Sequence, residues 1–410
     1  MTIRSFTAVY TQVVLPLAMV DEIITDISSP VVVPRDQAYK DAINITIQDV
    51  ADDADDTDDT SPTMSAIIYK QLNEVELVRR PKPQIQAPGD AIVKVLHASI
   101  CGTDLHILQG HVPTCQPGRI LGHEGVGIIE SLGAGVTTLA VGARVLIACI
   151  SSCGVCTPCR GGLSAHCSTG GWILGHTIDG TQAEYVRVPH AACSLFPLQE
   201  NVSVKAALPL SDSVPTAYDV GLLPGNIRPG AKVAIVGAGP VALALLMLAK
   251  LYSPKCVVVI GRGESRLETA KQLGADHVVS TLNGEEAAIR GALEVSGGVG
   301  FDLVSECVGS PEAFNVCQRL LATGGTLTNA GVHGCQVTFD LHQLWSKNIN
   351  VESKLVSHDH TSWLIDLVES NLLDPQVLVS HVFPLASAQD AYVAFKAGSK
   401  KGVLKVAIEM

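Results

Sequence analysis

The sequence lacks a hydrophobic run long enough to cross a membrane as a helix. Its longest uncharged run, from Val233 to Ala249, has seventeen residues and is interrupted by Gly-Ala-Gly-Pro. A spanning helix needs about 20 consecutive apolar residues. A strand, a turn and a buried helix fit this run better, so no association with a membrane is predicted.

The sequence also lacks a basic patch and an N-terminal segment with the strongly basic start of a signal peptide. The net charge is −12, and residues 1–63 hold twelve acidic and three basic residues, so most of the acidity lies in that segment. Nucleic acid is therefore not expected as a partner. Without a secretory signal the expected location is the cytoplasm, where clustered cysteines usually bind metal.

No internal repeat is found, and the texture of the sequence divides the chain into four parts. Residues 1–63 indicate an acidic, disordered extension, and its role or its origin as an upstream gene-model addition stays open. Residues 64–215 are β-rich, residues 216–354 alternate strands with helices, and residues 355–410 return to mixed short elements. The alternation predicts a parallel sheet covered by helices on both faces. The predicted fold is α/β, with a β-rich domain and a doubly wound nucleotide-binding domain.

A dinucleotide-binding motif lies in "KVAIVGAGPVALALLMLAKL". Gly237, Gly239 and Ala242 form a G-x-G-x-x-A pattern that follows an apolar strand and opens a helix. The first glycine permits a tight turn, the second lets the backbone approach a pyrophosphate, and the small third residue lets helix and strand pack closely. Pro240 and Val241 lie at the start of this helix, whose N-terminus faces the anion.

The end of the next strand, "CVVVIGRGESR", bears on the choice between NAD and NADP. An NAD site usually has Asp or Glu here to bind the ribose 2′-hydroxyl, but Gly261 and Arg262 stand in its place. Because a guanidinium pairs with a 2′-phosphate, NADP is favoured. Two alternatives stay open: Glu264 reaches the ribose of NAD after a small loop shift, or Arg262 is only a solvated loop charge.

Two further stretches carry potential metal ligands, "ICGTDLHILQG" and "GRILGHEGVGIIESLGAGV". The second contains G-H-E-x2-G-x5-G-x2-V from Gly122 to Val136. This pattern resembles the signature of the zinc-containing alcohol dehydrogenases of the medium-chain dehydrogenase/reductase family, and the resemblance covers essentially all of residues 64–410. It implies a GroES-like catalytic domain, completed by residues 355–410, beside a Rossmann nucleotide-binding domain.

The resemblance also implies the ligands of a catalytic zinc. Cys101 and His123 match two ligands, and Asp212, in "LPLSDSVPTAYDV", occupies the place of the third. Glu124 is expected beside the metal, able to bind it when water leaves. A catalytic zinc takes about three protein ligands and keeps one open position. The set Cys, His, Glu and Asp resembles the secondary-alcohol branch of the family, although Asp212 also fits an ordinary helix N-cap.

Further roles follow from the same resemblance. Thr103 is expected to contact the alcohol oxygen, and His106 to pass the proton to solvent by way of the nicotinamide ribose, unless it is a plain surface histidine. Asp104 is expected to orient His123. Trp172 and Leu105 are expected to line a mainly apolar substrate pocket, with plain hydrophobic filling as the alternative for Trp172. Val308 and Val332 are expected near the nicotinamide ring.

Four cysteines lie close together in "CGVCTPCRGGLSAHC", at Cys153, Cys156, Cys159 and Cys167. Four thiolates form a closed tetrahedral shell without an open position, which is typical of a structural zinc. Two disulfides are the alternative, and the tight C-x2-C spacing and a reducing compartment disfavour them. Two zinc ions per chain are therefore expected, one for the reaction and one for structure.

The predicted function is zinc-dependent, NADP-preferring interconversion of an alcohol, secondary or small primary, with a ketone or aldehyde. A polyol or amino-alcohol dehydrogenase of the same family is the alternative, and a nucleotide-binding relative without catalysis is a remote one. Zinc-free quinone reductases lack the Cys101 and His123 pair. The resemblance implies a homodimer or homotetramer and leaves the physiological substrate open.

Overall fold

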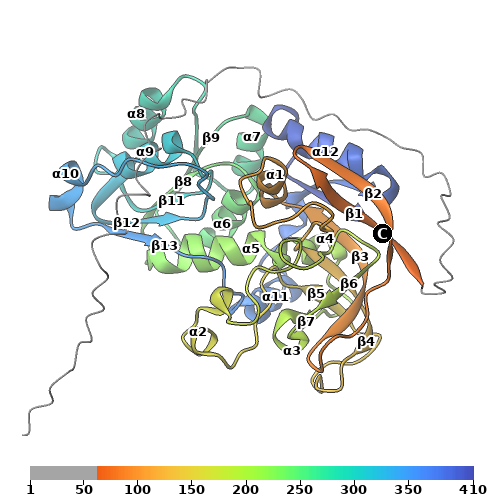
Figure 1. Ribbon diagram of the computed structural model, residues 1–410. Coiled ribbons are helices and arrows are strands. Elements are labelled where there is room, and N and C mark those ends of the chain that lie inside the picture. The colour runs from red at the N-terminus through yellow and green to blue at the C-terminus, as the bar shows by residue number, and fades with distance from the viewer. Residues whose placement is uncertain (1–61) are drawn as a thin grey trace, which may run out of the picture. The chain divides into compact units, whose positions relative to one another are not determined.

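The structure is a computed structural model that describes residues 62–410. The expectation of a disordered extension over residues 1–63 therefore lies almost wholly outside the described residues. The described chain forms three sheets, of two, six and seven strands. The first is the antiparallel pair β1 (Thr63–Gln71) and β2 (Glu74–Pro81) (Figure 1).

The seven-stranded sheet joins segments from both ends of the described chain. Its order is β14-β15-β3-β4-β5-β7, and β6 pairs with β3. The C-terminal strand β15 lies antiparallel to β3, so residues of the last segment complete the sheet that begins near residue 91. The strands are β3 (Ala91–Ile100), β4 (Gly125–Leu132), β5 (Arg144–Ile147), β6 (Tyr185–Val188), β7 (Leu195–Pro197), β14 (Val379–Pro384) and β15 (Lys405–Glu409).

The six-stranded sheet is parallel throughout and has the order β10-β9-β8-β11-β12-β13. Starting from its first strand in sequence, this is the 3-2-1-4-5-6 order of a doubly wound dinucleotide fold. The predicted parallel sheet is therefore confirmed. The strands are β8 (Lys232–Val236), β9 (Cys256–Gly261), β10 (His277–Ser280), β11 (Phe301–Glu306), β12 (Leu321–Asn329) and β13 (Asn350–Ser353).

Helices connect these parallel strands and cover the sheet (Figure 1). They are α6 (Pro240–Lys250), α7 (Glu264–Gln272), α8 (Glu285–Ser296), α9 (Pro311–Leu320) and α10 (Leu341–Leu344). The long apolar run of the sequence falls on β8 and α6. Both are buried by neighbours, because β8 lies between β9 and β11 and seven of the eleven residues of α6 are buried. A strand covered on both faces has a continuous hydrophobic sequence.

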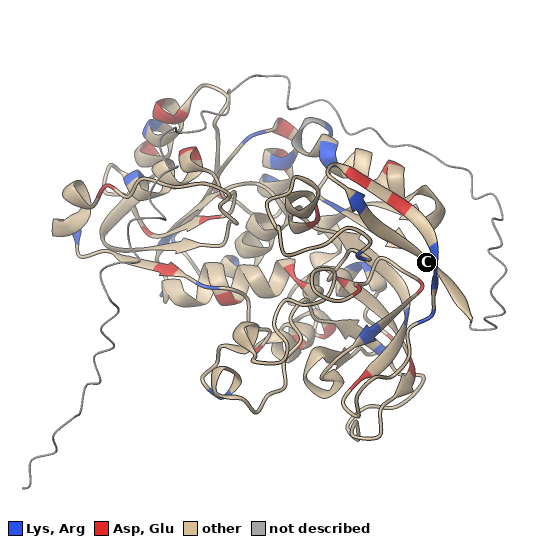
Figure 2. Cartoon of the chain, viewed as in Figure 1, with Lys and Arg blue, Asp and Glu red and all other residues tan. Residues whose placement is uncertain are grey.

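The other helices surround the seven-stranded sheet or link it to the parallel one. They are α1 (Gly102–Leu108), α2 (Thr157–Arg160), α3 (Ala191–Ser194), α4 (Val204–Ala207), α5 (Ser213–Thr216), α11 (Thr361–Glu369) and α12 (Ala388–Ala397). Among the described residues, no helix is long and apolar enough to span a membrane. Acidic and basic side chains are interspersed over the described elements (Figure 2).

Candidate catalytic and metal-binding sites

The structure brings Cys101, His123, Glu124 and Asp212 together, with one ligand atom of each within 4.8 Å of the others. Cys101 is the N-cap of α1, directly after β3, and His123 and Glu124 lie directly before β4. Asp212 lies between a short 3-10 turn and α5. Cys101 Sγ is 3.3 Å from Asp212 Oδ2, and His123 Nε2 is 3.7 Å from the same oxygen.

These distances fit the requirements of a zinc ion. With Zn–N and Zn–S bonds of about 2.0–2.3 Å, tetrahedral ligand atoms lie about 3.3–3.8 Å apart. The Cys101 thiol and the His123 imidazole each lie at such a distance from the Asp212 carboxylate. The chemistry of the donors, soft sulfur with nitrogen and oxygen, also suits zinc.

The charges of the cluster are strongly coupled. Burial raises the pKa of the Cys101 thiol, and the Asp212 carboxylate raises it further. Burial by itself would lower the pKa of His123, but its contacts with Asp212 and Cys101 raise it well above the ordinary value. The Asp212 pKa falls well below its ordinary value, because His123 outweighs the effect of burial. His123 thus supplies the positive charge beside the Asp212 carboxylate, and a metal cation bound among these ligands would supply it instead.

Glu124 makes an ion pair that the sequence did not indicate. Both of its oxygens accept hydrogen bonds from the Lys405 ammonium, at 2.7 and 2.6 Å, and Ser99 donates another. Glu124 and Lys405 are 0% and 2% exposed. Burial lowers the pKa of Lys405, but Glu124 and its neighbours more than compensate and raise it above the ordinary value. Lys405 is the one charged residue in the apolar run "GVLKVAI", which was the available signal.

The second oxygen of Asp212 faces another group of side chains. Asp212 Oδ1 accepts a hydrogen bond from Thr216 at 2.9 Å and lies 3.7 Å from Cys149 Sγ. The Cys149 sulfur is 3.1 Å from His358 Nε2, and His358 Nδ1 is 2.8 Å from Thr361 Oγ1. Cys149 and His358 are both buried. Nothing in the sequence near residues 149 or 358 indicates this pairing, because it depends on a contact between distant segments.

The predicted proton-transfer residues lie on α1. Thr103 Oγ1 is 3.6 Å from Cys101 Sγ, at the edge of the metal cluster. His106 follows about one helical turn later, and its Nδ1 is 3.2 Å from Nδ1 of the exposed His111. Burial lowers the pKa of His106, and His111 lowers it further. His106 therefore lies between the interior of the site and its surface.

Asp104 accepts hydrogen bonds at the start of α1. Its Oδ2 accepts hydrogen bonds from the Cys101 backbone N–H at 2.9 Å and from Gln182 Nε2 at 3.1 Å. Its Oδ1 is buried without a hydrogen-bond partner among the described residues. Asp104 therefore fixes the start of α1, which carries Cys101, and an orienting contact with His123 stays a prediction.

Of the predicted pocket residues, Trp172 lies next to His123 and Leu105 lies on α1. The Trp172 ring meets the His123 ring edge-on, with ring centres 6.3 Å apart, and stacks on His176 at 4.3 Å. His176 is held by Thr114 Oγ1 at 2.6 Å and by the Trp172 carbonyl at 3.0 Å. Trp172 and Leu105 both pack against one hydrophobic cluster. The wall next to His123 is thus aromatic and apolar.

The four cysteines from Cys153 to Cys167 form a second cluster, with sulfur atoms all within 4.8 Å of one another. Cys156 Sγ is 3.4 Å from Cys159 Sγ and 3.9 Å from Cys167 Sγ. The backbone N–H of Ser168 is the main cause of a Cys156 pKa lowered to about 6. Sulfur atoms at these distances are too far apart for disulfides and are spaced as zinc ligands are.

The glycine motif forms a turn between β8 and α6. Gly237 has φ +125°, and a Cβ there would lie 3.1 Å from the Cys307 carbonyl oxygen. Gly239 is the N-cap of α6, and a Cβ on it would meet nothing within 4 Å. Ala242 is completely buried against the sheet. The structure therefore leaves open space before the first helical residues, Pro240 and Val241, where an anion would bind.

Loops at the carboxyl ends of β11 and β12 lie beside this turn. Glu306 Oε1 accepts hydrogen bonds from the Val308 and Gly309 backbone N–H groups at 2.8 and 2.9 Å. Its carboxylate is also 3.3 Å from His333 Nε2. Val308 and Val332 are 52% and 58% exposed. Glu306 and His333, absent from the sequence prediction, fix the two loops that present these valines.

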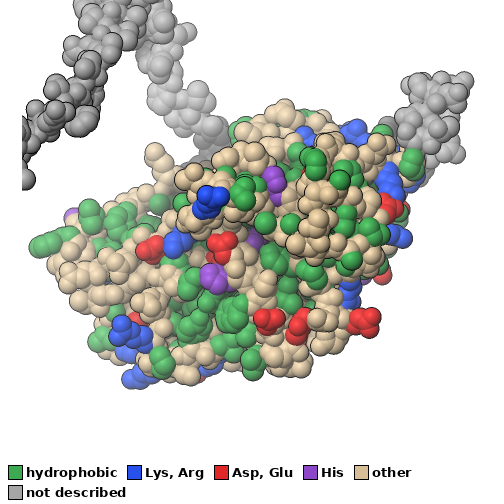
Figure 3. All heavy atoms as spheres, turned by 90° about the horizontal axis from the view of Figure 1, so that it is seen from below, with side chains coloured by type: hydrophobic (Ala, Val, Ile, Leu, Met, Phe, Trp, Pro, Cys, Tyr) green, Lys and Arg blue, Asp and Glu red, His purple; other side chains and the backbone are tan. Residues whose placement is uncertain are grey.

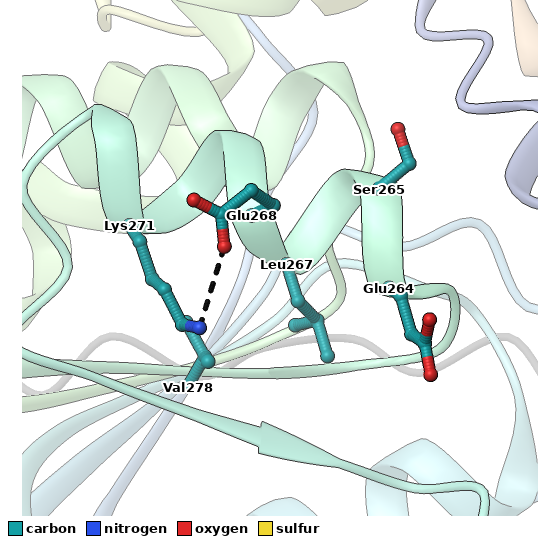
Figure 4. Close-up of a pocket in the computed structure, with 6 residues that line it drawn as sticks. All are labelled: Glu264, Ser265, Leu267, Glu268, Lys271 and Val278. Atoms are coloured by element: carbon teal, nitrogen blue, oxygen red, sulfur yellow. Dashed lines mark hydrogen bonds and ion pairs between the residues drawn. The ribbon is translucent and has the colours of Figure 1, made fainter.

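At the end of β9, Gly261 is buried and Arg262 is exposed to solvent. A Cβ on Gly261 would lie 2.9 Å from Ala238 Cβ, while the Arg262 side chain is exposed. Glu264 begins α7 and lines an open depression of about 470 Å³ with five other residues of α7 and β10. In this depression Lys271 Nζ forms an ion pair with Glu268 Oε2 at 3.3 Å. Figure 4 shows that Glu264 lies apart from this ion pair.

Two family models match the chain. Residues 87–199 match "Alcohol dehydrogenase GroES-like domain", and residues 240–370 match "Zinc-binding dehydrogenase". An alcohol dehydrogenase from Cupriavidus necator is 34% identical over 366 residues, covering 84% of this chain and 98% of the relative. The chain belongs to the zinc-containing alcohol dehydrogenases of the medium-chain dehydrogenase/reductase family. The predicted family and fold class are therefore confirmed.

Solved structures agree with this assignment. A zinc-dependent alcohol dehydrogenase 2 from Streptococcus pneumonia, in its apo form, has a TM-score of 0.81 and 44% identity, covering 84% of this chain and 98% of that chain. An Escherichia coli dehydrogenase complexed with NADH has a TM-score of 0.77, 28% identity, and coverage of 85% and 99%. A Sinorhizobium meliloti zinc-binding dehydrogenase bound to NADP has a TM-score of 0.74, 26% identity, and coverage of 85% and 100%.

Proposed function

We propose that this chain interconverts secondary or small primary alcohols with ketones or aldehydes, using zinc and NADP. The observation that carries the proposal is the cluster of the buried His123 with the partly buried Cys101 and Asp212, whose donor atoms have the spacing of zinc ligands. A bound zinc ion would act as a Lewis acid that lowers the pKa of the alcohol hydroxyl, and a bound nicotinamide would accept the hydride.

The residues of the chain serve this reaction by binding, orientation and proton movement. Cys101, His123 and Asp212 would hold the metal, and Thr216 fixes the carboxylate of Asp212. Thr103, next to Cys101, is placed to accept the hydroxyl proton of the substrate. His106 and the exposed His111 beside it then carry the proton toward solvent. Trp172 and Leu105 exclude water from the apolar side of the pocket.

Lys405 binds both oxygens of Glu124, the remaining member of this cluster. A carboxylate bound to an ammonium on both oxygens is neutralised where it lies and does not repel the Asp212 carboxylate strongly. A fourth ligand position thus stays available for the substrate oxygen, as a catalytic zinc requires. Glu124 would bind the metal only after parting from Lys405.

We propose a second, structural zinc in the cluster of Cys153, Cys156, Cys159 and Cys167. The support is that all four donors are thiols and that they fill a complete tetrahedral shell. The zinc would hold the segment from residue 153 to residue 167 in place. Together the two clusters give two zinc ions per chain.

A preference for NADP over NAD rests on Arg262. Its exposed guanidinium directly follows β9, where a 2′-phosphate would lie, and Gly261 offers no carboxylate to repel that phosphate. Glu264, the first residue of α7 and two positions after Arg262, is the residue that would favour NAD instead. Replacing Arg262 with Leu should raise KM for NADP about tenfold or more and leave KM for NAD nearly unchanged.

We also propose that the chain forms a homo-oligomer. Strand β13 is the outer strand of the parallel sheet, and Trp345, which precedes it, is 73% exposed. Phe339, Leu341 and Val351 add exposed apolar surface to the same region. Figure 3 shows hydrophobic side chains on this face, at the end where Figure 1 places α10. An open strand edge beside apolar surface favours pairing with a second copy, which light scattering after size-exclusion chromatography would detect.

Steady-state kinetics test the proposed reaction most broadly. Reduction of NADP and of NAD would be followed with primary, secondary and polyhydric alcohols, before and after treatment with a zinc chelator. We expect chelator-sensitive reduction of NADP that is fastest with simple secondary or small primary alcohols. Faster turnover of polyols would favour the polyol dehydrogenase alternative, and turnover that the chelator leaves intact in a zinc-free protein would contradict the proposal.

A further inference from the structure

A fifth cysteine lies beside the four-cysteine cluster. Cys193 is on α3, and its side chain is exposed. Its Sγ is 3.1 Å from the position that a Cβ on Gly154 would take, and Gly154 directly follows Cys153. The Cys193 thiol therefore packs on the backbone that carries the first cysteine of the cluster, although it is distant from it in sequence.

Hydrogen bonds hold the two segments together on either side of this contact. Next to Cys193, Ser194 Oγ accepts a hydrogen bond from the Ser152 backbone N–H at 3.3 Å and lies 3.1 Å from Ser151 Oγ. At the start of α3, His190 Nε2 is 3.0 Å from Thr169 Oγ1, which is 3.8 Å from Cys167 Sγ. These contacts bracket Cys193 and keep it beside the cluster.

The backbone before α3 is shaped for this position. His190 has φ +52°, in the left-handed region that few residues other than glycine adopt. Its carbonyl accepts a hydrogen bond from Ser194 Oγ at 3.0 Å. The tight turn presents α3 to the cluster.

The five thiols differ in their chemical state. Four are arranged as zinc ligands, and zinc keeps its cysteine ligands deprotonated. Cys193 is not one of these four ligands, so its sulfur is not used by the metal, and its side chain is exposed. Thiolates react with peroxides, and a nearby second thiol converts the oxidised product to a disulfide. The arrangement provides both partners.

We propose that Cys193 is the resolving thiol of a redox-sensitive metal site, in which a hydroperoxide converts Cys153 and Cys193 to a disulfide and releases the structural zinc. This inference rests on the proposed structural zinc site. It adds a modification site to a part of the chain that does not take part in hydride transfer.

The reaction balances in two steps. Hydrogen peroxide transfers one oxygen atom to the Cys153 thiolate and, with uptake of a proton, gives a sulfenic acid and water. The Cys193 sulfur then attacks the sulfenic sulfur, and the hydroxyl leaves with the thiol proton as a second water molecule. The two cysteine sulfurs lose two electrons, and the peroxide gains them. Only three thiolates remain for the zinc, which weakens its binding.

Loss of this zinc should also disturb the surroundings of the catalytic cluster. Ser164, between Cys159 and Cys167, donates a hydrogen bond to the Ser357 carbonyl and lies 3.4 Å from Asp359 Oδ1. His358, between these two residues, contacts Cys149 next to Asp212. A disordered segment 153–167 would withdraw the Ser164 contact, so activity is expected to fall after the zinc is released.

The test compares the purified zinc-loaded enzyme with Cys193→Ser and with Cys335→Ser. Cys335 is a second exposed cysteine, in the nucleotide-binding part of the chain, and is the matched control. Each protein is treated with hydrogen peroxide while a chromogenic chelator reports zinc release. Disulfides are mapped by mass spectrometry after alkylation, and alcohol oxidation is measured in parallel.

The wild type and Cys335→Ser should release about one zinc per chain and form a disulfide between Cys153 and Cys193. Their alcohol oxidation should recover after thiol reduction with added zinc. Cys193→Ser should begin with unchanged activity and release zinc about tenfold more slowly. Equal release rates in Cys193→Ser and wild type, or disulfides only among the four ligand cysteines, would overturn the proposal. An untreated enzyme with about one zinc per chain, which Cys156→Ser also retains, would instead refute the structural zinc site itself.

Discussion

The two metal-ligand clusters of this chain are built in opposite ways. The four cysteines of one lie within fifteen consecutive residues, and three of them are only partly buried. The other cluster draws Cys101, His123, Glu124 and Asp212 from three segments that together span more than a hundred residues, and the buried Lys405 comes from the C-terminal strand. A local cluster needs only its own loop, whereas a dispersed cluster needs the whole fold.

The difference follows from what each cluster has to do. A structural zinc needs four strong ligands and no open position, which one short loop provides. A catalytic metal needs mixed donors, an open position, and neighbours that control charge and proton movement. These neighbours, Lys405, Cys149 and His358, come from different parts of the chain.

Replacement of His123 should have the largest effect, and this effect should be confined to the dispersed cluster. His123→Ala removes the imidazole of the dispersed cluster, and kcat/KM for alcohol oxidation should fall by at least about a thousandfold. Metal at the four cysteines should remain, as elemental analysis would show. His277→Ala, at an exposed histidine on β10, is the control and should retain activity. Full activity in His123→Ala would exclude the proposed catalytic site.

Replacement of Lys405 should show how far the dispersed cluster depends on the fold. Lys405→Met leaves the buried Glu124 carboxylate without its ammonium partner and with only the hydrogen bond from Ser99, so the free energy of unfolding should fall by about 3–5 kcal/mol in a urea titration. The double variant Lys405→Met with Glu124→Gln should regain most of this loss.

The matched control for Lys405 is Lys250→Met. Lys250 pairs with Asp276 at 3.3 Å in a largely exposed position, and its loss should cost less than about 1 kcal/mol. If Lys405→Met were as mild as Lys250→Met, Lys405 and Glu124 would not act as a buried pair.

Acid should weaken the surroundings of the dispersed cluster through His358. Burial lowers the pKa of His358 to about 4. Between the ordinary pKa of about 6.5 and this value, the unfolded chain binds a proton that the folded chain excludes. Stability is therefore full above about pH 6.5 and is lost as the pH falls toward 4, by about 3 kcal/mol.

Urea unfolding at pH 7, 5.5 and 4.5 checks this effect. His358→Asn should lose less stability than the wild type over this range, and His342→Asn, at an exposed histidine, should behave as the wild type does. The same loss of stability in wild type and His358→Asn would assign the acid sensitivity to other groups.

The smallest effect is expected where the two clusters are linked. Ser164→Ala removes the hydrogen bond to the Ser357 carbonyl, which should cost about 1 kcal/mol of unfolding free energy. Thermal unfolding of the zinc-loaded protein measures it. Ser168→Ala, at an exposed serine of the same loop, should change little. No difference between these two variants would mean that the clusters are structurally independent.

The local features of the fold and of the sites were the predictable ones. The parallel sheet follows from short apolar strands alternating with helices, and the glycine turn after β8 from its spacing. The four cysteines and the Gly122–Val136 pattern are likewise contiguous in sequence. For each of these, the information lies within one supersecondary unit.

The contacts around Asp212 were not predictable in the same way. The pairing of Cys149 with His358 joins residues 209 positions apart, and that of Lys405 with Glu124 residues 281 positions apart. Such contacts depend on how β15 and the segment before α11 pack, which no local pattern specifies. The structure places Asp104 Oδ2 on the Cys101 N–H, and the contact of Asp104 with His123 stays a prediction.

Zinc content measured together with activity tests the division between the two clusters most directly. Elemental analysis of the folded wild type should find about two zinc ions per chain, and about one in both Cys101→Ser and Cys156→Ser. Cys101→Ser should be inactive, while Cys156→Ser should be less stable but still oxidise alcohol. An inactive Cys101→Ser with about two zinc ions, or a folded Cys156→Ser that keeps its remaining zinc but has lost hydride transfer, would contradict this account.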